Sequence, residues 1–154
     1  MIVNYFISVG FQLVKYTHSF ISITFLIFAC WVIIRSIHGV IKSKTYTKLD
    51  KFLSFAFIIN LYLQLIFGLI LFSNLGSSQG NDYLVGEISN NMVSKRLWPI
   101  EHIVLMLFAL LIANLGLIIS IKTGNDREKH RKILIYYLVS LLMIALSLCI
   151  NYFF

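Results

Sequence analysis

The stretch that decides the fold is Trp98–Ile121, which reads WPIEHIVLMLFALLIANLGLIISI. It is long enough to cross a hydrocarbon core of about 30 Å as a helix, because such a crossing takes roughly 20 apolar residues. Yet a carboxylate and an imidazole, Glu101 and His102, stand side by side near its beginning. Ionisable groups inside a membrane are costly and by default mark a functional site. The stretch therefore predicts both a membrane span and the place to look for function.

Three further segments share this length and apolar character. Of the 154 residues in the chain, 59% are hydrophobic and 12% are charged, whereas a soluble domain averages about half and about a quarter. The other predicted spans are Leu13–Val40, Phe52–Ser73 and Ile133–Phe154. Short basic turns join the first to the second and the third to the fourth, and residues 74–97 form a longer polar loop. We therefore predict an all-α fold, an integral membrane four-helix antiparallel bundle that forms a single transmembrane domain over residues 1–154.

The Lys and Arg residues orient this bundle, because positive residues are retained on the cytoplasmic side of a membrane. Ten of them fall on one face: Arg35, Lys42, Lys44, Lys48, Lys51, Lys122, Arg127, Lys129, Arg131 and Lys132. The other face carries three, which are Lys15, Lys95 and Arg96. Both termini and the 74–97 loop are therefore expected outside the cytoplasm. The net charge of +7 is then mostly a cytoplasmic rim that attracts anionic lipid headgroups, so no nucleic-acid partner is needed to explain it.

The start of the chain and its two cysteines fit a multi-pass membrane protein. The apolar N-terminus has no basic region ahead of it and no small-residue cleavage site after it, so we expect it to be retained. Residues 1–12 either extend the first helix outward or lie along the interface. Cys30 and Cys149 fall near opposite ends of the predicted bundle, which disfavours a disulfide. The sequence contains no Cys-x-x-Cys-His, no phosphate loop and no zinc-protease pattern.

Two histidines stand at the same predicted depth. His18 follows Tyr16 by two residues and His102 follows Trp98 by four, which places both roughly one turn inside the outer aromatic belt at about 1.5 Å per residue. The first and third helices run in the same direction, so the two imidazoles can face each other across the interior. This arrangement suits one haem b with two axial histidines, or a metal ion with further ligands. The alternative for both is an interfacial side chain that reaches headgroup water.

Two further polar residues are candidates for supporting such a site. Gln64 lies about two turns deeper in the second helix, where it can hydrogen-bond a ligand or back a histidine; the alternative is an interhelical contact. Glu101 points about 100° away from the histidine that follows it, but it can reach His18 or Arg96. The alternative is a helix-start residue, since Pro99 suits the first helical position and the helix dipole favours an acidic first turn.

The remaining polar residues of the spans have structural interpretations. Asn60 and Asn114 lie on adjacent segments, where an amide pair would stabilise packing modestly. His38 and His130 lie at the cytoplasmic end and could together hold a second haem. Their charged surroundings favour solvated surface side chains instead.

From about Leu13 to its end, the chain resembles a family of small four-helix bacterial membrane proteins that are labelled cytochrome b-like or hypothetical. The resemblance lies in the order and spacing of several short motifs. The resemblance rests on His18-Ser19-Phe20, Tyr46-Thr47-Lys48-Leu49-Asp50, Gln64 with Gly68 and Leu71, Trp98 with Glu101-His102 and Met106, and Lys129-His130-Arg131-Lys132 followed by Tyr137. Members often carry an arginine where this chain has Ser22, and His38 is not part of their pattern. The resemblance implies a bacterial plasma membrane location. It implies five site residues: His18, Gln64, Glu101, His102 and His130.

Two functions from different classes follow as expectations, and neither is that of a stand-alone enzyme. The first is a haem b protein that transfers electrons between a quinone or membrane partner and an acceptor on the outer side. His18 and His102 would ligate the iron, Gln64 and Glu101 would lie next to them, and Glu101 could serve as the acid–base group of a quinone site. The alternative is a cofactor-free accessory subunit of a larger membrane complex. Proton or metal transport would need a polar path through the inner half, which only the two asparagines offer.

Overall fold

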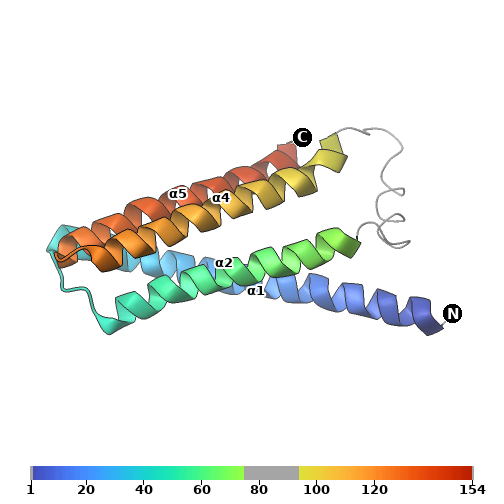
Figure 1. The fold of residues 1–154 in the computed structure, drawn as a ribbon, viewed down its shortest axis with the longest axis horizontal. Helices are drawn as coiled ribbons and strands as arrows, with labels where there is room; N and C mark the ends of the chain where they lie inside the picture. Colours follow the sequence, from blue (N-terminus) through green and yellow to red (C-terminus); the bar gives the residue numbers. More distant parts are fainter. Residues whose placement is uncertain (1, 75–93, 154) are drawn as a thin grey trace.

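Four long helices make up the part of the chain that the computed structural model describes, residues 2–74 and 94–153. In chain order they are α1 (Ile2–Lys42), α2 (Lys48–Asn74), α4 (Ser94–Lys122) and α5 (Asp126–Phe153). All four are long and apolar enough to cross a membrane, and no strand occurs in the described ranges. The prediction of an all-α, four-helix bundle is therefore confirmed (Figure 1).

The helices begin earlier in the sequence than predicted. Helices α2, α4 and α5 include the polar residues that precede their apolar runs, and α1 includes the apolar residues 2–12. At the start of α2, the backbone N–H of Thr47 donates to Oδ2 of Asp50 at 2.8 Å, and the N–H of Asp50 reaches back to the Thr47 hydroxyl at 3.4 Å. This reciprocal pair is a capping box. At the start of α5, Asn125 caps the helix by accepting from the N–H of Arg127 at 2.9 Å.

The structure describes part of the N-terminal segment and part of the predicted 74–97 loop. Residues 2–12 belong to α1, so the leader extends the first helix and does not form a separate interfacial segment. Asn74 ends α2 and residues 94–97 begin α4. The rest of the predicted 74–97 loop lies outside the described residues.

The end of α1 is closed by contacts that satisfy its last carbonyl groups. Ser43 adopts the left-handed conformation, with φ at 47°, which is the conformation that commonly ends a helix and usually falls to glycine. The N–H of Lys44 then donates to the carbonyl of Gly39 at 3.1 Å. Nε of Arg127 donates to the carbonyl of Val40 at 3.0 Å, which ties this end of α1 to the beginning of α5.

The helices form an up-and-down bundle in which each helix occupies one corner. Helix α1 packs against α2 and α5, and α4 packs against the same two helices, so α1 and α4 occupy opposite corners. Both short turns lie at one end of the bundle, whereas α1 starts and α5 finishes at the other (Figure 1). We call these the inner end and the outer end, after the orientation that the basic residues predict.

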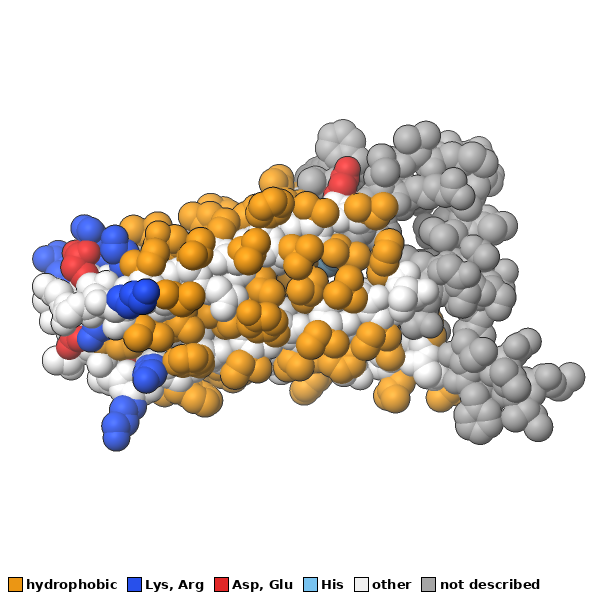
Figure 2. All heavy atoms as spheres, viewed as in Figure 1, with side chains coloured by type: hydrophobic (Ala, Val, Ile, Leu, Met, Phe, Trp, Pro, Cys, Tyr) orange, Lys and Arg blue, Asp and Glu red, His pale blue; other side chains and the backbone are white. Residues whose placement is uncertain are grey.

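The bundle has an apolar exterior and a mainly aliphatic core that also contains Phe25, Phe57 and Tyr137. Figure 2 shows hydrophobic side chains along its length and Lys and Arg side chains gathered at the inner end. Exposed apolar residues such as Leu13, Phe20 and Leu142 are consistent with contact with lipid. In the core, Phe57 stacks on Tyr137 with ring centroids 4.2 Å apart. This stack joins α2 to α5 across the interior.

Candidate functional site

His18 and His102 lie in the outer half of the bundle, on helices at opposite corners. The two imidazoles are close enough to interact electrostatically, so the fold brings together the residues that share one predicted depth. The Nδ1 atom of His18 is buried and has no hydrogen-bond partner in the described part of the chain. A buried polar atom without a partner is unusual and requires an explanation, and ligation of a bound group is one.

Ser147 of α5 orients the second histidine. Its Oγ lies 2.6 Å from Nδ1 of His102, and its side chain is buried. A hydrogen bond at Nδ1 is the arrangement expected when Nε2 of a histidine is the ligand atom, because it fixes both the tautomer and the ring orientation. Ser147 is not among the residues predicted from the sequence. The available signal is its spacing of seven residues from Ser140, which places two buried serines on one face of α5.

Gln64 joins α2 to α1 beside the first histidine. Its side chain is buried, and its Nε2 donates to Ser22 Oγ at 2.8 Å and to the carbonyl of His18 at 3.3 Å. The Ser22 hydroxyl donates to the same carbonyl at 2.9 Å. These bonds hold the turn of α1 that carries His18 and leave its imidazole unbound. Ser22, where the resembling family carries arginine, thus serves as the acceptor for Gln64.

The imidazole of His18 lies next to Gly68 of α2. A Cβ atom built on Gly68 would stand 3.6 Å from Cε1 of His18, which is an ordinary van der Waals distance. Helices α1 and α2 therefore leave room for a methyl group at this level.

Glu101 is separate from the histidine pair. Its side chain is exposed, and no hydrogen bond or ion pair joins it to His18 within the described residues. The predicted contact with Arg96 depends on a side chain that the structure does not describe. The position of Glu101 near the start of α4 makes it accessible from the surface of the outer half.

The other candidate ligands do not gather around this site. In residues 2–74 and 94–153, no group of three or more His, Cys, Asp or Glu side chains is arranged to hold a metal ion. Cys30 and Cys149 are exposed and unpaired, as expected. A six-coordinate haem b, in contrast, needs only two axial side chains from the protein.

The inner end contains a denser set of polar contacts. Arg35 of α1 binds Asp50 of α2 through two bonds, Nε to Oδ1 at 2.6 Å and Nη2 to Oδ2 at 3.1 Å. The carboxylate is buried and also accepts from the Thr47 hydroxyl at 2.6 Å. A buried charge is tolerated only when it is paired and hydrogen-bonded. Asp50 therefore needs Arg35, and this pair holds α1 against α2.

Two tyrosines extend these contacts into the core. The hydroxyl of Tyr46 and Oγ of Ser54 share a hydrogen bond of 2.9 Å, and the hydroxyl of Tyr137 donates to the Ser54 carbonyl at 2.9 Å. Burial raises the pKa of Tyr46, so its phenol stays neutral at physiological pH and keeps its hydrogen-bonding proton. These tyrosines carried the family resemblance, and in this fold they pack the inner end.

His130 is 2% exposed, so the expectation of a solvated surface side chain is wrong for this residue. Its ring packs edge-on against Tyr46, with centroids 5.0 Å apart, and lies directly on Gly39 of α1. A Cβ atom on Gly39 would stand 2.4 Å from the ring, so the glycine permits the close approach of α1 and α5. Gly39 is the sequence signal that would have indicated burial of a large side chain here.

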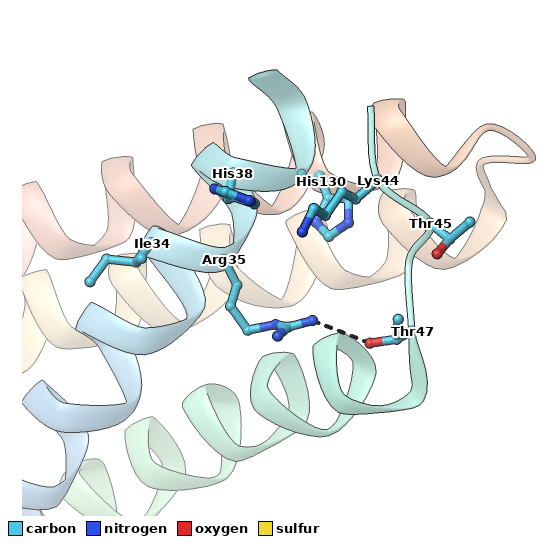
Figure 3. Close-up of a pocket in the computed structure, with 8 residues that line it drawn as sticks. Ile34, Arg35, His38, Lys44, Thr45, Thr47 and His130 are labelled. Atoms are coloured by element: carbon cyan, nitrogen blue, oxygen red, sulfur yellow. Dashed lines mark hydrogen bonds between the residues drawn. The ribbon is translucent and has the colours of Figure 1, made fainter. Parts of the chain in front are cut away.

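The two histidines of the inner end line the same cavity. His38 is exposed, as expected, and both it and His130 border a cavity of about 400 Å³ (Figure 3). The remaining lining residues are Ile34, Arg35, Gly39, Lys44, Thr45 and Thr47. This cavity is distinct from the His18–His102 pair, which lies toward the other end of the bundle.

Asn60 and Asn114 do not form the amide pair expected from their positions. Each donates to the carbonyl four residues earlier in its own helix, Ala56 for the first and Leu110 for the second. Oδ1 of Asn60 also accepts from the Thr24 hydroxyl at 3.2 Å. These bonds satisfy the amides within the bundle and assign them to packing.

No protein-family model, curated protein or solved structure matches the chain. The resemblance to cytochrome b-like membrane proteins therefore stays a prediction. The function has to be argued from the side chains described above.

Proposed function

We propose that this protein binds haem b in the outer half of its bundle and transfers electrons within a membrane, with His18 and His102 as the axial ligands. One observation carries the proposal. The imidazoles of His18 and His102, on helices at opposite corners, are close enough to interact electrostatically, and His18 has a buried Nδ1 atom that no described protein group satisfies. Two such imidazoles fit the axial positions of a six-coordinate haem.

The neighbouring residues have defined roles in this proposal. Ser147 holds the ring of His102 through Nδ1, and Gln64 with Ser22 holds the backbone that carries His18. When bound, the haem supplies a one-electron centre whose potential depends on its axial ligands, hydrogen bonds and burial. Glu101 is exposed and is proposed to exchange a proton with a quinone at the surface.

The location belongs to the same proposal. An apolar exterior and a basic inner end support a multi-pass protein of a bacterial plasma membrane, with the histidine pair in the half of the bilayer away from the cytoplasm. Electrons would then pass between a quinone or membrane partner and an acceptor on the outer side.

The test is an absorption spectrum of the purified protein in its oxidised and dithionite-reduced forms, after expression with adequate haem. We expect a Soret band and sharp reduced bands, and their loss in His18→Ala and His102→Ala proteins that still insert in the membrane. The matched control is His38→Ala, because His38 is an exposed histidine at the inner end. Wild-type spectra in both ligand variants would show that the assigned ligands are wrong.

A cofactor-free accessory subunit is the alternative, supported by the hydrogen bonds of Gln64 and Ser147, which also join helices when no group is bound. It predicts a colourless protein that copurifies with larger membrane partners in mild detergent. A colourless protein that migrates alone would contradict both functions.

A further inference from the structure

The cavity at the inner end combines a buried imidazole that has no partner with an excess of positive charge. His130 is 2% exposed, and both of its ring nitrogens lack a hydrogen-bond partner among the described residues. Each additional buried polar atom without a partner destabilises a fold unless something satisfies it. Because His130 borders a cavity of about 400 Å³, a group bound in that cavity is the direct way to satisfy it.

The residues that line the cavity favour a negatively charged ligand. Its lining contains the cations Arg35 and Lys44, the histidines His38 and His130, and no acidic residue. Asp50, the acidic residue nearest to Arg35, is already bound by that guanidinium through Nε and Nη2. Asp50 neutralises Arg35, so the lining keeps one formal positive charge, that of Lys44, which no ion pair among the described residues compensates, and it carries no negative charge.

The carbonyl acceptors at the cavity rim are already used, as are Nε and Nη2 of Arg35 and the hydroxyl of Thr47. The polar side chains of the lining that have no hydrogen bond among the described residues are those of His38, Lys44, Thr45 and His130. The carbonyl of Gly39 accepts from the N–H of Lys44, and that of Val40 accepts from Arg127, so the end of α1 presents little uncompensated negative charge. Figure 3 shows His38 and Arg35 projecting from α1, Thr45 and Thr47 on the connecting segment, and His130 between them. Ammonium, guanidinium, imidazole and hydroxyl donors around one space are the groups that bind phosphate.

We propose that this cavity binds a phosphate group, carried either by an anionic membrane lipid with a terminal phosphate or by a soluble phosphate. The cavity lies among the basic residues of the inner end, at the level where lipid headgroups meet the cytoplasm. Its volume falls in the range of small-molecule sites. The proposal does not depend on haem, because it concerns residues at the other end of the bundle.

The test measures the melting temperature of the full-length protein in a neutral detergent with three separate additions at matched ionic strength: inorganic phosphate, dioctanoyl phosphatidic acid and dioctanoyl phosphatidylcholine. At tenfold excess over the dissociation constant we expect a phosphate-bearing ligand to raise the melting temperature by about 3 °C. A rise with inorganic phosphate identifies a soluble ligand, and a rise with phosphatidic acid alone identifies a lipid. No rise with either, or an equal rise with phosphatidylcholine, overturns the proposal.

Two variants and one matched control connect the effect to the cavity. His130→Leu should abolish the response without lowering the melting temperature of the ligand-free protein, since it removes two unpartnered buried nitrogens while keeping a side chain of similar size. Lys44→Gln, at an exposed lining residue, should weaken binding at least tenfold and leave the fold intact. Lys48→Gln removes the same charge from an exposed residue outside the cavity and should respond like wild type. Equal responses from Lys44→Gln and Lys48→Gln would overturn the assignment.

Discussion

The inner and outer ends of this bundle are built differently. At the inner end, Arg35 and Thr47 bind the buried carboxylate of Asp50, and α1 approaches α5 so closely that a Cβ on Gly39 would clash with the His130 ring. At the outer end the described polar contacts are few and a Cβ on Gly68 would fit. Among the described residues, the helices approach each other more closely at the inner end, while the outer end leaves room for a methyl group beside His18.

The ends can differ in this way because the hydrophobic effect does not drive helices together inside a lipid bilayer. Lipid chains are as apolar as leucine, so helices in a bilayer associate through close contacts and hydrogen bonds rather than through burial of apolar surface. In this protein such contacts concentrate at the inner end. The histidine pair lies in the other half of the bundle, where fewer such contacts are described.

The largest effect is expected from breaking the contacts of Asp50 at the inner end. Asp50→Ala removes the partner of Arg35 and half of the capping box of α2, so we expect a loss of about 3 kcal/mol in the free energy of unfolding. Unfolding in mixed detergent would measure it. The control is Glu128→Ala, which removes a more exposed i,i+3 pair with Arg131 of 2.9 Å and should cost about 0.5 kcal/mol or less. Similar losses in both would show that the Asp50 contacts are not what holds the inner end.

The next largest effect is a difference in stability between alanine substitutions of Gly39 and Gly68. Gly39→Ala should destabilise the protein by about 2 kcal/mol, because its methyl group overlaps the ring of His130 and forces α1 and α5 apart. Gly68→Ala should be neutral or stabilising by about 0.5 kcal/mol, because the methyl group fits beside His18 and alanine favours a helix. Melting temperatures of the two variants would test the difference in packing between the ends. Equal destabilisation by both would remove that difference.

A smaller effect is expected from Ser147→Ala, which tests whether Ser147 orients a ligating histidine or only packs α5 against α4. Ser147→Ala removes the hydrogen bond at Nδ1 of His102, so we expect haem affinity to fall about tenfold in a titration of the apoprotein. Ser140→Ala is the matched control, since Ser140 is a buried serine on the same helix that donates instead to the carbonyl of Ala109 at 2.9 Å. It should leave haem affinity unchanged. A parallel fall in both variants would assign Ser147 to packing alone.

The smallest effect is expected at the acidic residue beside the histidine. Because the Glu101 side chain is exposed and unconnected to His18, Glu101→Gln should change neither the reduced spectrum nor the melting temperature measurably. The rate of reduction by a quinol should fall if Glu101 accepts its proton. A lost Soret band in this variant would place Glu101 among the groups that hold the haem.

Part of the site was predictable from sequence. The shared depth of His18 and His102 followed from their distances to Tyr16 and Trp98, because helical rise is regular. The burial of His130 was not predictable from its own surroundings, since its neighbours in the chain are charged and only packing against Gly39 takes it out of water. The role of Ser147 was missed for the same reason, because its partner is on another helix.

The sequence by itself determined that the chain forms four apolar helices long enough to cross a membrane, and it predicted which end faces the cytoplasm. Those properties depend on length, hydropathy and charge along the chain, and each can be read locally. Only the tertiary structure decided that α1 and α4 stand at opposite corners, that Ser147 reaches His102, and that His130 borders a positively charged cavity. These facts depend on which helix faces meet, and helix contacts in lipid are set by close side-chain fit, which no single segment contains.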